Sequence, residues 1–271
     1  MQLIIPAYNE EARLPGTIAA LRAHTLGARE SVSPVEVIVV DNASSDDTAG
    51  VARRLDSPAM RVRVIHCDIR GKGAAVRAGM QATTASVVGF MDADCATDLA
   101  ALEAAMRHLD AGADVAIGSR AVEGSETMQR HSQVRSHGAA LYRRLTNKIA
   151  PGIADTQCGF KLMRGDVARS AFESLRTKGF SFDVELLARL QDAGARIVEF
   201  PVTWIDMPGS TFVPARHGVM SFVELARIAG YVRPLDRRFG RVVTLEKAPQ
   251  IFAPSASVLS TGAALPTITE A

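Results

Sequence analysis

The chain has 271 residues, of which 47% are hydrophobic and 22% are charged, and its formal net charge is +2. This length and composition are typical of one large soluble domain with a well-filled core. The small net charge gives no basis for a nucleic-acid partner. Three cysteines, far apart and odd in number, fit neither a disulfide framework nor a zinc site, and they are typical of a reducing compartment.

The first residues and the apolar runs bear on location. The opening MQLIIPAYNEE reaches a proline after five residues, which is too few for the apolar core of a signal peptide and indicates a buried strand. No run approaches the ~18 apolar residues that a membrane-spanning helix needs. We therefore expect a cytoplasmic protein, and any contact with a membrane would be peripheral.

Short apolar runs alternate with helical patterns through the first 120 residues. The runs predict buried strands at Leu3–Ile5, Val37–Val40, Val62–Ile65, Val87–Met91 and Val115–Ile117. Between them, apolar residues lie at helical spacing at Leu14, Ile18 and Leu21, and again at Leu99, Leu102, Met106 and Leu109. This alternation predicts an α/β fold with a doubly wound, mainly parallel sheet, in which ligands bind outside the carboxyl ends of the strands.

The pattern changes in the second half of the chain. We expect a basic amphipathic helix between Thr127 and Pro151, a helix at Val184–Ala193, a strand at Ile197–Val202 and a last helix at Phe222–Val232. Trp204 lies on an apolar strand and is expected in the core. Residues 246–271 are rich in Ala, Pro, Ser and Thr with almost no charge, which predicts a disordered tail after a domain at 1–245.

The strongest local signal is Asp92-Ala93-Asp94, directly after the run VVGFM. In extended chain the side chains of residues i and i+2 point the same way, so both carboxylates can face one point. Hard oxygen ligands of this kind favour Mg²⁺ or Mn²⁺, which would neutralise the charge on a departing diphosphate. An Asp-X-Asp sequence alone is weak, because such pairs also cap helices.

Two further loops follow strands in equivalent positions. Asp41, after the strand VIVV, could accept a hydrogen bond from a base or a ribose hydroxyl, while Asp46 and Asp47 are better explained as caps of the next helix. In the third loop, Gly71-Lys72-Gly73, glycines would let the backbone approach a phosphate, and Lys72 or Arg77 would add positive charge.

Taken in order, these motifs carry a resemblance. Pro6-Ala7-Tyr8-Asn9-Glu10-Glu11, the Asp41 loop, Gly71-Lys72-Gly73, Asp92-Ala93-Asp94 and Gly118-Ser119-Arg120 occur as in inverting family 2 glycosyltransferases. Asp155-Thr156-Gln157-Cys158-Gly159-Phe160-Lys161 and Gly179–Glu185 resemble the dolichyl-phosphate glucosyltransferase and mannosyltransferase branch. The resemblance covers roughly residues 1–232 and implies a GT-A fold, a Rossmann-like, mainly parallel sheet flanked by helices.

The resemblance also implies roles for individual residues. The nucleotide sugar, UDP- or GDP-linked, would be bound by Pro6, Ala7, Tyr8, Glu10, Asp41, Lys72, Asp92 and Ala93, with Asp92 and Asp94 as ligands of Mg²⁺ or Mn²⁺. The phosphate of a polyprenyl acceptor would meet Arg120 and Arg135, and Lys161 is a further candidate for binding the acceptor. Arg135 is equally well explained as part of a solvated helix face.

The acceptor decides whether a general base is needed. A hydroxyl acceptor must lose a proton, whereas a phosphate monoester is largely ionised at neutral pH. Asp155 and Asp183 are equal candidates for the base, together with Arg120 in the catalytic set, although both carboxylates could instead orient sugar hydroxyls or Lys161. Glu185 is better explained as structural.

One departure from the resemblance weakens a lipid-phosphate acceptor. Thr211 stands where such relatives often carry a lysine, and Arg216 or His217 would have to substitute for it. A soluble hydroxyl acceptor, such as a sugar or nucleoside, is therefore the alternative. More remote alternatives are a sugar-1-phosphate nucleotidyltransferase and a non-catalytic nucleotide-sugar binding protein, and a homodimer stays open.

Overall fold

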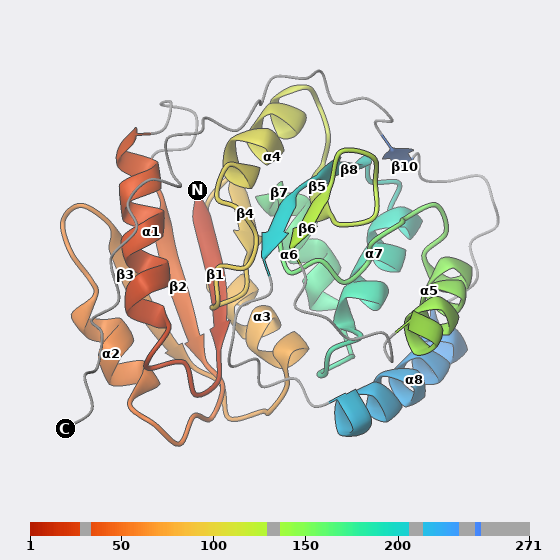
Figure 1. The fold of residues 1–271 in the computed structure, drawn as a ribbon, viewed down its shortest axis with the longest axis horizontal. Helices are drawn as coiled ribbons and strands as arrows, with labels where there is room; N and C mark the ends of the chain where they lie inside the picture. Colours follow the sequence, from red (N-terminus) through yellow and green to blue (C-terminus); the bar gives the residue numbers. More distant parts are fainter. Residues whose placement is uncertain (28–33, 129–135, 206–213, 233–241, 245–271) are drawn as a thin grey trace, which may run out of the picture.

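The computed structural model describes residues 1–27, 34–128, 136–205, 214–232 and 242–244. Arg135, Thr211 and the predicted tail at 246–271 lie outside these residues, so the predictions made for them are not tested. Figure 1 shows a central twisted sheet covered by helices on both faces.

The main sheet has eight strands among the described residues, in the order β10-β8-β5-β7-β4-β1-β2-β3. Their bounds are β1 Gln2–Ala7, β2 Glu36–Asp41, β3 Arg61–His66, β4 Val87–Phe90, β5 Val115–Ser119, β7 Lys161–Arg164, β8 Ile197–Pro201 and β10 Val242–Thr244. All neighbours in this sheet pair in parallel except β7, which runs antiparallel to both β4 and β5. A second, two-stranded sheet joins β6 (Glu126–Met128) and β9 (Thr203–Ile205).

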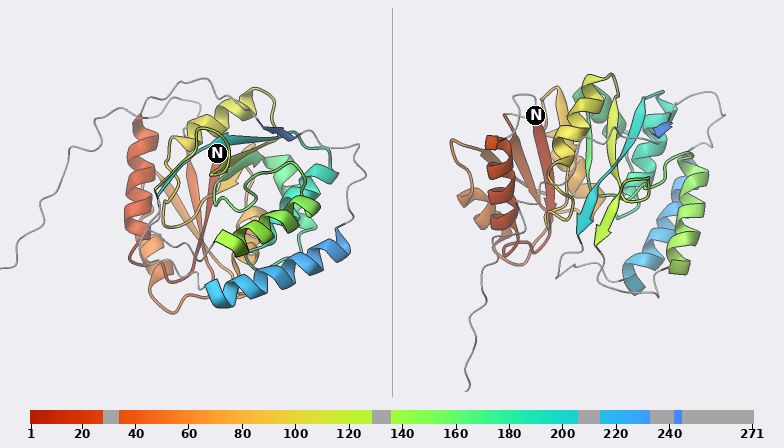
Figure 2. Two further views of the ribbon diagram at one scale, coloured as in Figure 1. Left: turned by 45° about the vertical axis from the view of Figure 1, so that its right-hand side comes forward. Right: turned by 45° about the horizontal axis from the view of Figure 1, so that its top comes forward.

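The helices form a layer on each face of the sheet, as the two views of Figure 2 show. Their bounds are α1 Leu14–Gly27, α2 Thr48–Arg54, α3 Lys72–Gln81, α4 Ala101–Asp110, α5 Ser136–Ile149, α6 Gly165–Glu173, α7 Phe182–Asp192 and α8 Pro214–Tyr231. None of the helices in the described part of the chain is both long enough and apolar enough to cross a bilayer.

Alternation along the strands divides the core into two clusters of buried side chains. Ile4 on β1 points into the cluster that α3, α6 and α7 cover, whereas its neighbours Leu3 and Ile5 point into the cluster that α1 and α4 cover. Because side chains of a strand alternate between faces, a strand covered on both sides must be apolar at successive positions. This is why the buried strands appear in the sequence as continuous apolar runs.

The predicted α/β class and the mainly parallel sheet are confirmed, and each predicted strand or helix that lies in the described ranges overlaps an observed one. The boundaries differ, most clearly for α8, which begins at Pro214, eight residues before the predicted Phe222. The sequence reading did not include β7, whose four residues Lys161–Arg164 are too short a run to stand out and begin with a lysine. That omission matters, because β7 positions much of the candidate site.

Candidate functional site

The carboxyl ends of β1, β2 and β4 lie at one edge of the sheet. Ala7, the last residue of β1, is opposite Asp41, the last residue of β2. On its other side β1 pairs in parallel with β4, whose last residue, Phe90, is followed two positions later by Asp92. The predicted donor-side residues are therefore brought to a common edge, as a doubly wound sheet requires.

The loops after β1 and β2 are locked together by side-chain hydrogen bonds. Asn9 has a positive φ of 56°, its backbone N–H donates to Ser44 Oγ at 3.1 Å, and its Oδ1 accepts from the N–H of Ser45 at 2.8 Å. Tyr8, next to this turn, is 38% exposed, and the Arg70 guanidinium lies 5.6 Å from the centre of its ring. The edge thus presents an aromatic face beside a cation, a surface on which a planar base can stack.

Asp41 and Asn42 hold the next part of this edge. Asp41 is buried, with Oδ2 3.0 Å from Nδ1 of His66 and Oδ1 accepting from the N–H of Ser44 at 3.3 Å. The Asn42 amide joins the loop after β3, since its Oδ1 accepts from Gly71 N–H at 2.7 Å and its Nδ2 donates to Ile69 O at 2.7 Å. No local pattern in the sequence indicates this connection.

Asp46 and Asp47, which were predicted to cap the next helix, both lie at the start of α2. Asp46 accepts a hydrogen bond from the backbone N–H of Thr48, the first residue of α2, at 3.0 Å. Asp47 occupies the N-cap position without a side-chain capping bond and pairs instead with Arg54 at 2.8 Å. Asp47 is thus the N-cap residue by position, as predicted, although its side chain makes no capping hydrogen bond.

Glu10 lies in an electrostatically unusual place for a carboxylate. It pairs with Arg13, with Nε 2.6 Å from Oε2. Burial raises the pKa of Glu10 to about 7, with further contributions from the charges of Asp94 and Asp92, although Arg13 opposes the shift. Three acidic groups thus lie close enough at this edge to repel one another, which favours the binding of a cation there.

Asp92 and Asp94 fit a divalent cation by the chemistry of their oxygen atoms. The Asp92 side chain is 38% exposed. Burial raises the pKa of Asp94, and the neighbouring charge of Asp92 raises it further. Room for the Asp92 carboxylate depends on Gly159, because a Cβ there would lie 1.9 Å from Asp92 Oδ2. In the described ranges no group of three or more His, Cys, Asp or Glu side chains is arranged to hold a metal. The cation would therefore need further oxygen ligands from water and substrate, as Mg²⁺ usually has.

Lys72, the first residue of α3, pairs with this acidic edge. Its Nζ lies 2.5 Å from Asp92 Oδ1, and its side chain is 17% exposed. Burial works to lower the pKa of Lys72, but the charges of Asp92 and Asp183 outweigh it, so the pKa is raised and the ammonium stays protonated. A fixed positive charge therefore stands beside the predicted metal ligand.

The glycines around Lys72 were expected to let the backbone approach a phosphate, and this expectation is wrong. The N–H of Gly73 donates to Gly179 O at 3.3 Å and that of Ala74 to Lys178 O at 3.1 Å. A Cβ on Gly71, which has a φ of 129°, would lie 2.2 Å from Lys178 O. The glycines instead allow the segment before α7 to pack against the start of α3. Arg77 also lies away from this edge and donates to Glu173 O at 3.3 Å.

The antiparallel strand β7 brings Asp155 to the same edge, where it pairs with Arg120. Asp155 Oδ2 accepts from Arg120 Nε at 2.7 Å and from the Arg120 backbone N–H at 3.0 Å, and Oδ1 accepts from Nη2 at 3.0 Å. Burial alone would raise the pKa of Asp155, but the hydrogen bonds and charge of Arg120 hold it below its ordinary value. Bidentate pairing of this kind fixes the orientation of the guanidinium as well as its charge.

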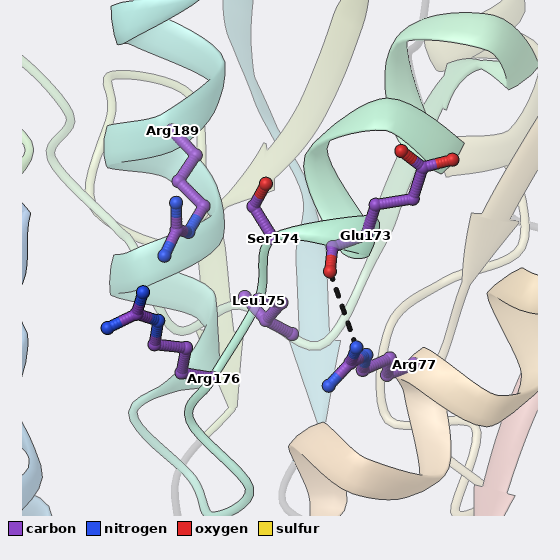
Figure 3. A pocket seen from close by; sticks show the side chains of 6 residues that line it. All are labelled: Arg77, Glu173, Ser174, Leu175, Arg176 and Arg189. Atoms are coloured by element: carbon purple, nitrogen blue, oxygen red, sulfur yellow. Dashed lines mark hydrogen bonds between the residues drawn. The ribbon is translucent and has the colours of Figure 1, made fainter.

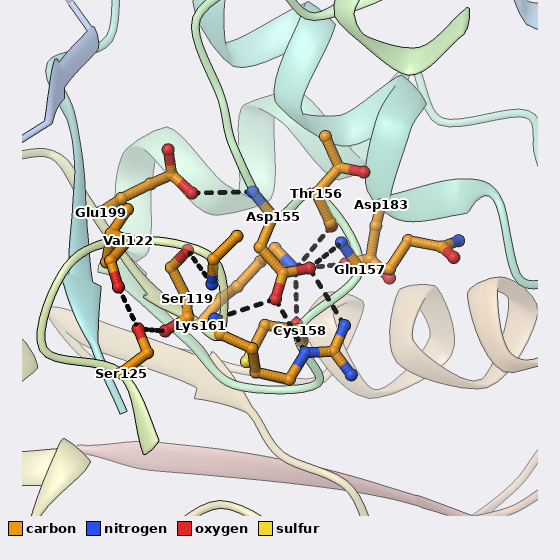
Figure 4. A network of polar contacts seen from close by, with 12 residues as sticks. Ser119, Val122, Ser125, Asp155, Thr156, Gln157, Cys158, Lys161, Asp183 and Glu199 are labelled. Carbon is orange, nitrogen blue, oxygen red and sulfur yellow. Dashed lines mark hydrogen bonds and ion pairs between the residues drawn. The ribbon is translucent and has the colours of Figure 1, made fainter. Parts of the chain in front are cut away.

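Glu199 fixes Asp155 from behind, as Figure 4 shows. It is fully buried on β8 and accepts from the backbone N–H groups of Ala154 at 2.8 Å and Asp155 at 3.0 Å. Sequence reasoning missed Glu199, although its signal was present, since a carboxylate inside the buried run IVEFP is costly unless it has partners.

Trp204 was expected in the core but is only half-buried. The Arg120 guanidinium lies 5.5 Å from the centre of its ring. Arg120 is thus held by a carboxylate and an aromatic face, and its side chain is still 31% exposed. The guanidinium keeps N–H groups for a ligand, since only Nε and Nη2 are used on Asp155.

Lys161 and Asp183 form a buried ion pair rather than an open binding group. Lys161 has no exposed surface, and its Nζ donates to Asp183 Oδ1 at 2.6 Å, Cys158 O at 2.8 Å and Thr156 O at 3.2 Å (Figure 4). These three acceptors use all three ammonium hydrogens. The predicted contact between Lys161 and the acceptor therefore conflicts with its position, whereas the alternative, in which Asp183 orients Lys161, agrees with it.

Neither candidate base presents an unpaired carboxylate. Asp155 is engaged by Arg120, and Asp183 is 2% exposed and engaged by Lys161. Burial raises the pKa of Asp183, while Lys161 and Lys72 act against the increase. Glu185 is structural as expected, because it accepts from the backbone N–H groups of Arg176 and Thr177 and from Arg189 and Tyr231.

The fold is the GT-A fold. Solved structures of glucosyl-3-phosphoglycerate synthase from Mycobacterium tuberculosis share the fold. The complex with Mn²⁺, uridine-diphosphate and glucosyl-3-phosphoglycerate has a TM-score of 0.60 and 19% identity, covering 84% of this chain and 79% of that one. The complex with Mg²⁺ and uridine-diphosphate has a TM-score of 0.59 and 18% identity, over 84% and 79%.

Sequence comparison then gives the family. Residues 2–172 match glycosyl transferase family 2, and the chain belongs to this family. A dolichyl-phosphate beta-glucosyltransferase of Drosophila melanogaster is 37% identical over 231 residues, 79% of this chain and 69% of the relative. The Homo sapiens protein of the same name is 35% identical over 228 residues, 79% of this chain and 70% of the relative. The resemblance in the sequence motifs is thereby confirmed.

A substitution at Gly73 tests the packing of the Lys72 loop. A Cβ there would lie 2.5 Å from Phe182 Cβ and 2.6 Å from Thr177 O. We expect Gly73→Ala to lower the free energy of unfolding by ~1–3 kcal/mol, as overpacking does, measured by urea denaturation. Gly16→Ala is the control, because nothing lies within 4 Å of its Cβ, and it should be neutral or stabilising by up to ~1 kcal/mol. Equal effects of the two variants would contradict the packing.

The Asp155–Arg120 pair predicts a pH dependence of stability. Because the pKa of folded Asp155 lies below its unfolded value of ~3.9, the pair stabilises fully above that pH and its contribution is lost as the pH falls through the folded pKa. Asp155→Asn should cost ~2 kcal/mol at pH 7 and less at pH 3.5 in urea denaturation. The exposed pair Asp47–Arg54 is the control, and Asp47→Asn should cost under ~1 kcal/mol. A cost for Asp155→Asn that is the same at both pH values would count against this account.

Proposed function

We propose that this chain transfers a hexose or N-acetylhexosamine, with inversion and with the help of Mg²⁺ or Mn²⁺, from a nucleotide diphosphate to a polyprenyl, dolichyl-type, phosphate. The observation that carries the acceptor assignment is the state of the two candidate bases. Asp155 is paired with the guanidinium of Arg120, and Asp183 is paired with the ammonium of Lys161. Arg120 lies in a fixed orientation at the same edge as Asp92. The names of the Drosophila melanogaster and Homo sapiens relatives support the same assignment.

The donor would lie along the edge formed by β1, β2 and β4. Pro6, Ala7 and Tyr8 supply the start of this surface, where the Tyr8 ring offers a stacking face, and Asp41 lies opposite Ala7. Glu10 would belong to the part of the site that binds the base and the ribose. Asp92, with Ala93 beside it, and Asp94 would hold the cation. When bound, the cation supplies positive charge that stabilises the nucleoside diphosphate as it departs.

Lys72 would contribute to the departure of the same leaving group. In the structure its ammonium is paired with Asp92, and its raised pKa keeps it charged. A charged donor beside the diphosphate stabilises the negative charge that develops on the leaving oxygen. Lys161 has a structural part in the site, because its three hydrogen bonds join the segment 156–158 to Asp183.

A phosphate acceptor explains why no free base is needed. With a second pKa near ~6, a phosphate monoester is largely a dianion at neutral pH and brings its own nucleophilic oxygen. That oxygen forms a bond to the anomeric carbon, the bond from this carbon to the diphosphate oxygen breaks, and the electron pair leaves with the nucleoside diphosphate. Arg120, held by Asp155 and Trp204, would bind the phosphate in a fixed orientation.

Contact with a membrane would let the protein reach a lipid acceptor. α5 and α8 pack together, with the Tyr142 and Phe222 rings 5.7 Å apart. Their outer surfaces expose Leu141 (52%), Met220 (53%) and Val223 (40%). Exposed apolar side chains beside the basic residues of α5 are typical of peripheral attachment to a bilayer surface. We propose that this helix pair forms the peripheral contact.

A donor-by-acceptor screen tests the function directly. UDP-glucose, UDP-N-acetylglucosamine and GDP-mannose are each offered with a polyprenyl phosphate and with soluble sugar or nucleoside acceptors, in Mg²⁺ or Mn²⁺. We expect turnover with the polyprenyl phosphate, and Asp92→Ala should lower it at least ~100-fold because a ligand of the cation is lost. Asp110→Ala, at an exposed site, is the control. Turnover with soluble hydroxyl acceptors alone would reject the lipid-phosphate assignment.

Arg120 is expected to act on the acceptor rather than the donor. Loss of a charge-assisted contact in Arg120→Gln should reduce kcat/KM for polyprenyl phosphate by about 100-fold, while the Kd for the nucleoside diphosphate stays the same. Arg120→Lys keeps the charge but not the planar guanidinium, so its kcat/KM should lie between those of wild type and Arg120→Gln. Arg54→Gln changes a largely exposed arginine and should match wild type. A parallel loss of nucleotide binding in Arg120→Gln would refute a role confined to the acceptor.

A further inference from the structure

A cleft of about 540 Å³ lies between α3, the end of α6 and α7, outside the edge that holds Asp92 and Arg120. It is lined by Arg77, Glu173, Ser174, Leu175, Arg176 and Arg189, and Figure 3 shows the three arginine side chains around it. Arg77 lies five residues after Lys72 on α3, which places it well around the helix from the edge residue. The cleft is therefore a separate feature from the glycosyltransferase site.

The guanidinium of Arg77 is only partly satisfied. Nη2 donates to Glu173 O at 3.3 Å, where α6 ends. Its Nε is buried without a hydrogen-bond partner among the described residues. A buried N–H of a charged group without an acceptor is unfavourable, so the side chain is suited to a ligand that brings an acceptor.

The two other arginines add charge from the opposite wall. Arg176 stacks on Tyr231 at 5.3 Å from the ring centre, and within the described ranges its guanidinium has no hydrogen-bond acceptor. Arg189 is fixed by Glu185, with Nη2 2.7 Å and Nε 2.8 Å from Oε1. Glu185 is also bound by Tyr231 and by two backbone N–H groups, so its charge is already engaged.

We propose that this cleft binds a phosphate group. Three arginines from separate elements line it, and planar guanidinium groups match phosphate oxygens through paired N–H donors. Among the described residues, the only carboxylate that lines the cleft is that of Glu173, which is exposed. The phosphate would belong either to a lipid headgroup or to a soluble phosphorylated compound, and the chemistry of recognition is the same.

The cleft connects to the glycosyltransferase site through the segment that follows Arg176. Thr177 N–H is held by Glu185 at 2.7 Å, and the next two carbonyls, of Lys178 and Gly179, accept from the start of α3. A phosphate bound to Arg176 and Arg77 would join that segment to α3 a second time. The ligand would therefore stabilise the packing that positions Lys72.

Thermal unfolding in inorganic phosphate tests the site. At constant ionic strength, the Tm of wild type should rise with phosphate concentration and saturate, because a ligand that binds the folded state stabilises it. Arg176→Gln and Arg77→Gln should each need about tenfold more phosphate than wild type for the same rise in Tm. The phosphate concentration that Arg176→Lys needs should lie between those of wild type and Arg176→Gln. Arg54→Gln is the matched control. The Tm of each variant without phosphate shows whether it folds.

Phosphate could also bind near Arg120, so the series is repeated in Arg120→Gln. If the rise of Tm with phosphate persists in Arg120→Gln and is weaker in Arg176→Gln, the result supports phosphate binding in the cleft. Protection that is lost in Arg120→Gln and unchanged in both Arg176→Gln and Arg77→Gln overturns the proposal. The absence of protection in wild type overturns it as well.

Vesicle sedimentation separates the two sources of phosphate. If a lipid headgroup is the ligand, wild type should bind phosphatidylglycerol vesicles more tightly than Arg176→Gln does, and inorganic phosphate should compete. If the ligand is soluble, wild type and Arg176→Gln should bind the vesicles equally, while their responses to inorganic phosphate still differ. Equal behaviour of the two proteins in both assays contradicts the proposal.

Discussion

The antiparallel strand β7 is the constraint on which the site depends. In a sheet of parallel strands, only the segments that follow strands reach the carboxyl edge. By running the other way between β4 and β5, β7 delivers the segment that precedes it to that edge. Lys161 is consequently opposite both Phe90 and Ile117, and Asp155 comes within reach of Arg120. One reversed strand therefore brings Asp155 and Lys161 to the edge that holds Asp92.

Charge at this edge is arranged in pairs that differ in their exposure. Lys161 and Asp183 are buried and fully satisfied, so they fix structure. The side chains of the pairs Lys72–Asp92 and Arg120–Asp155 are partly exposed, so a ligand can reach both pairs from solvent. A negatively charged ligand can therefore approach two cations whose positions are already fixed, and little side-chain freedom is lost when it binds. This difference in exposure separates the residues that hold the site from those suited to contact substrate.

The positions of the residues proposed for the donor followed from the sequence more readily than those of the residues proposed for the acceptor, for physical reasons. Residues such as Asp41 and Asp92 follow long apolar runs, and strand order alone brings them together. The environment of Lys161 depends on a short strand and on Asp183 in a later helix, so no local pattern indicates that it is buried. The glycines beside Lys72 were misread because glycine permits close approach of any backbone, and here that backbone is the chain's own. For Glu199 the buried run IVEFP indicates that partners are needed, but the partners themselves are backbone groups distant in sequence and could not be predicted.

The place of β7 in the sheet also affects how the chain must be assembled. β4 and β5 are made before α5 and before the strand that lies between them. Until β7 is added, each of these apolar strands has an unpaired edge, and such edges invite pairing with other chains. A nascent or truncated chain that ends before Lys161 would therefore be prone to aggregate, even though its first three strands can already pair. The reversed strand that completes the site thus also makes late synthesis a vulnerable stage of folding.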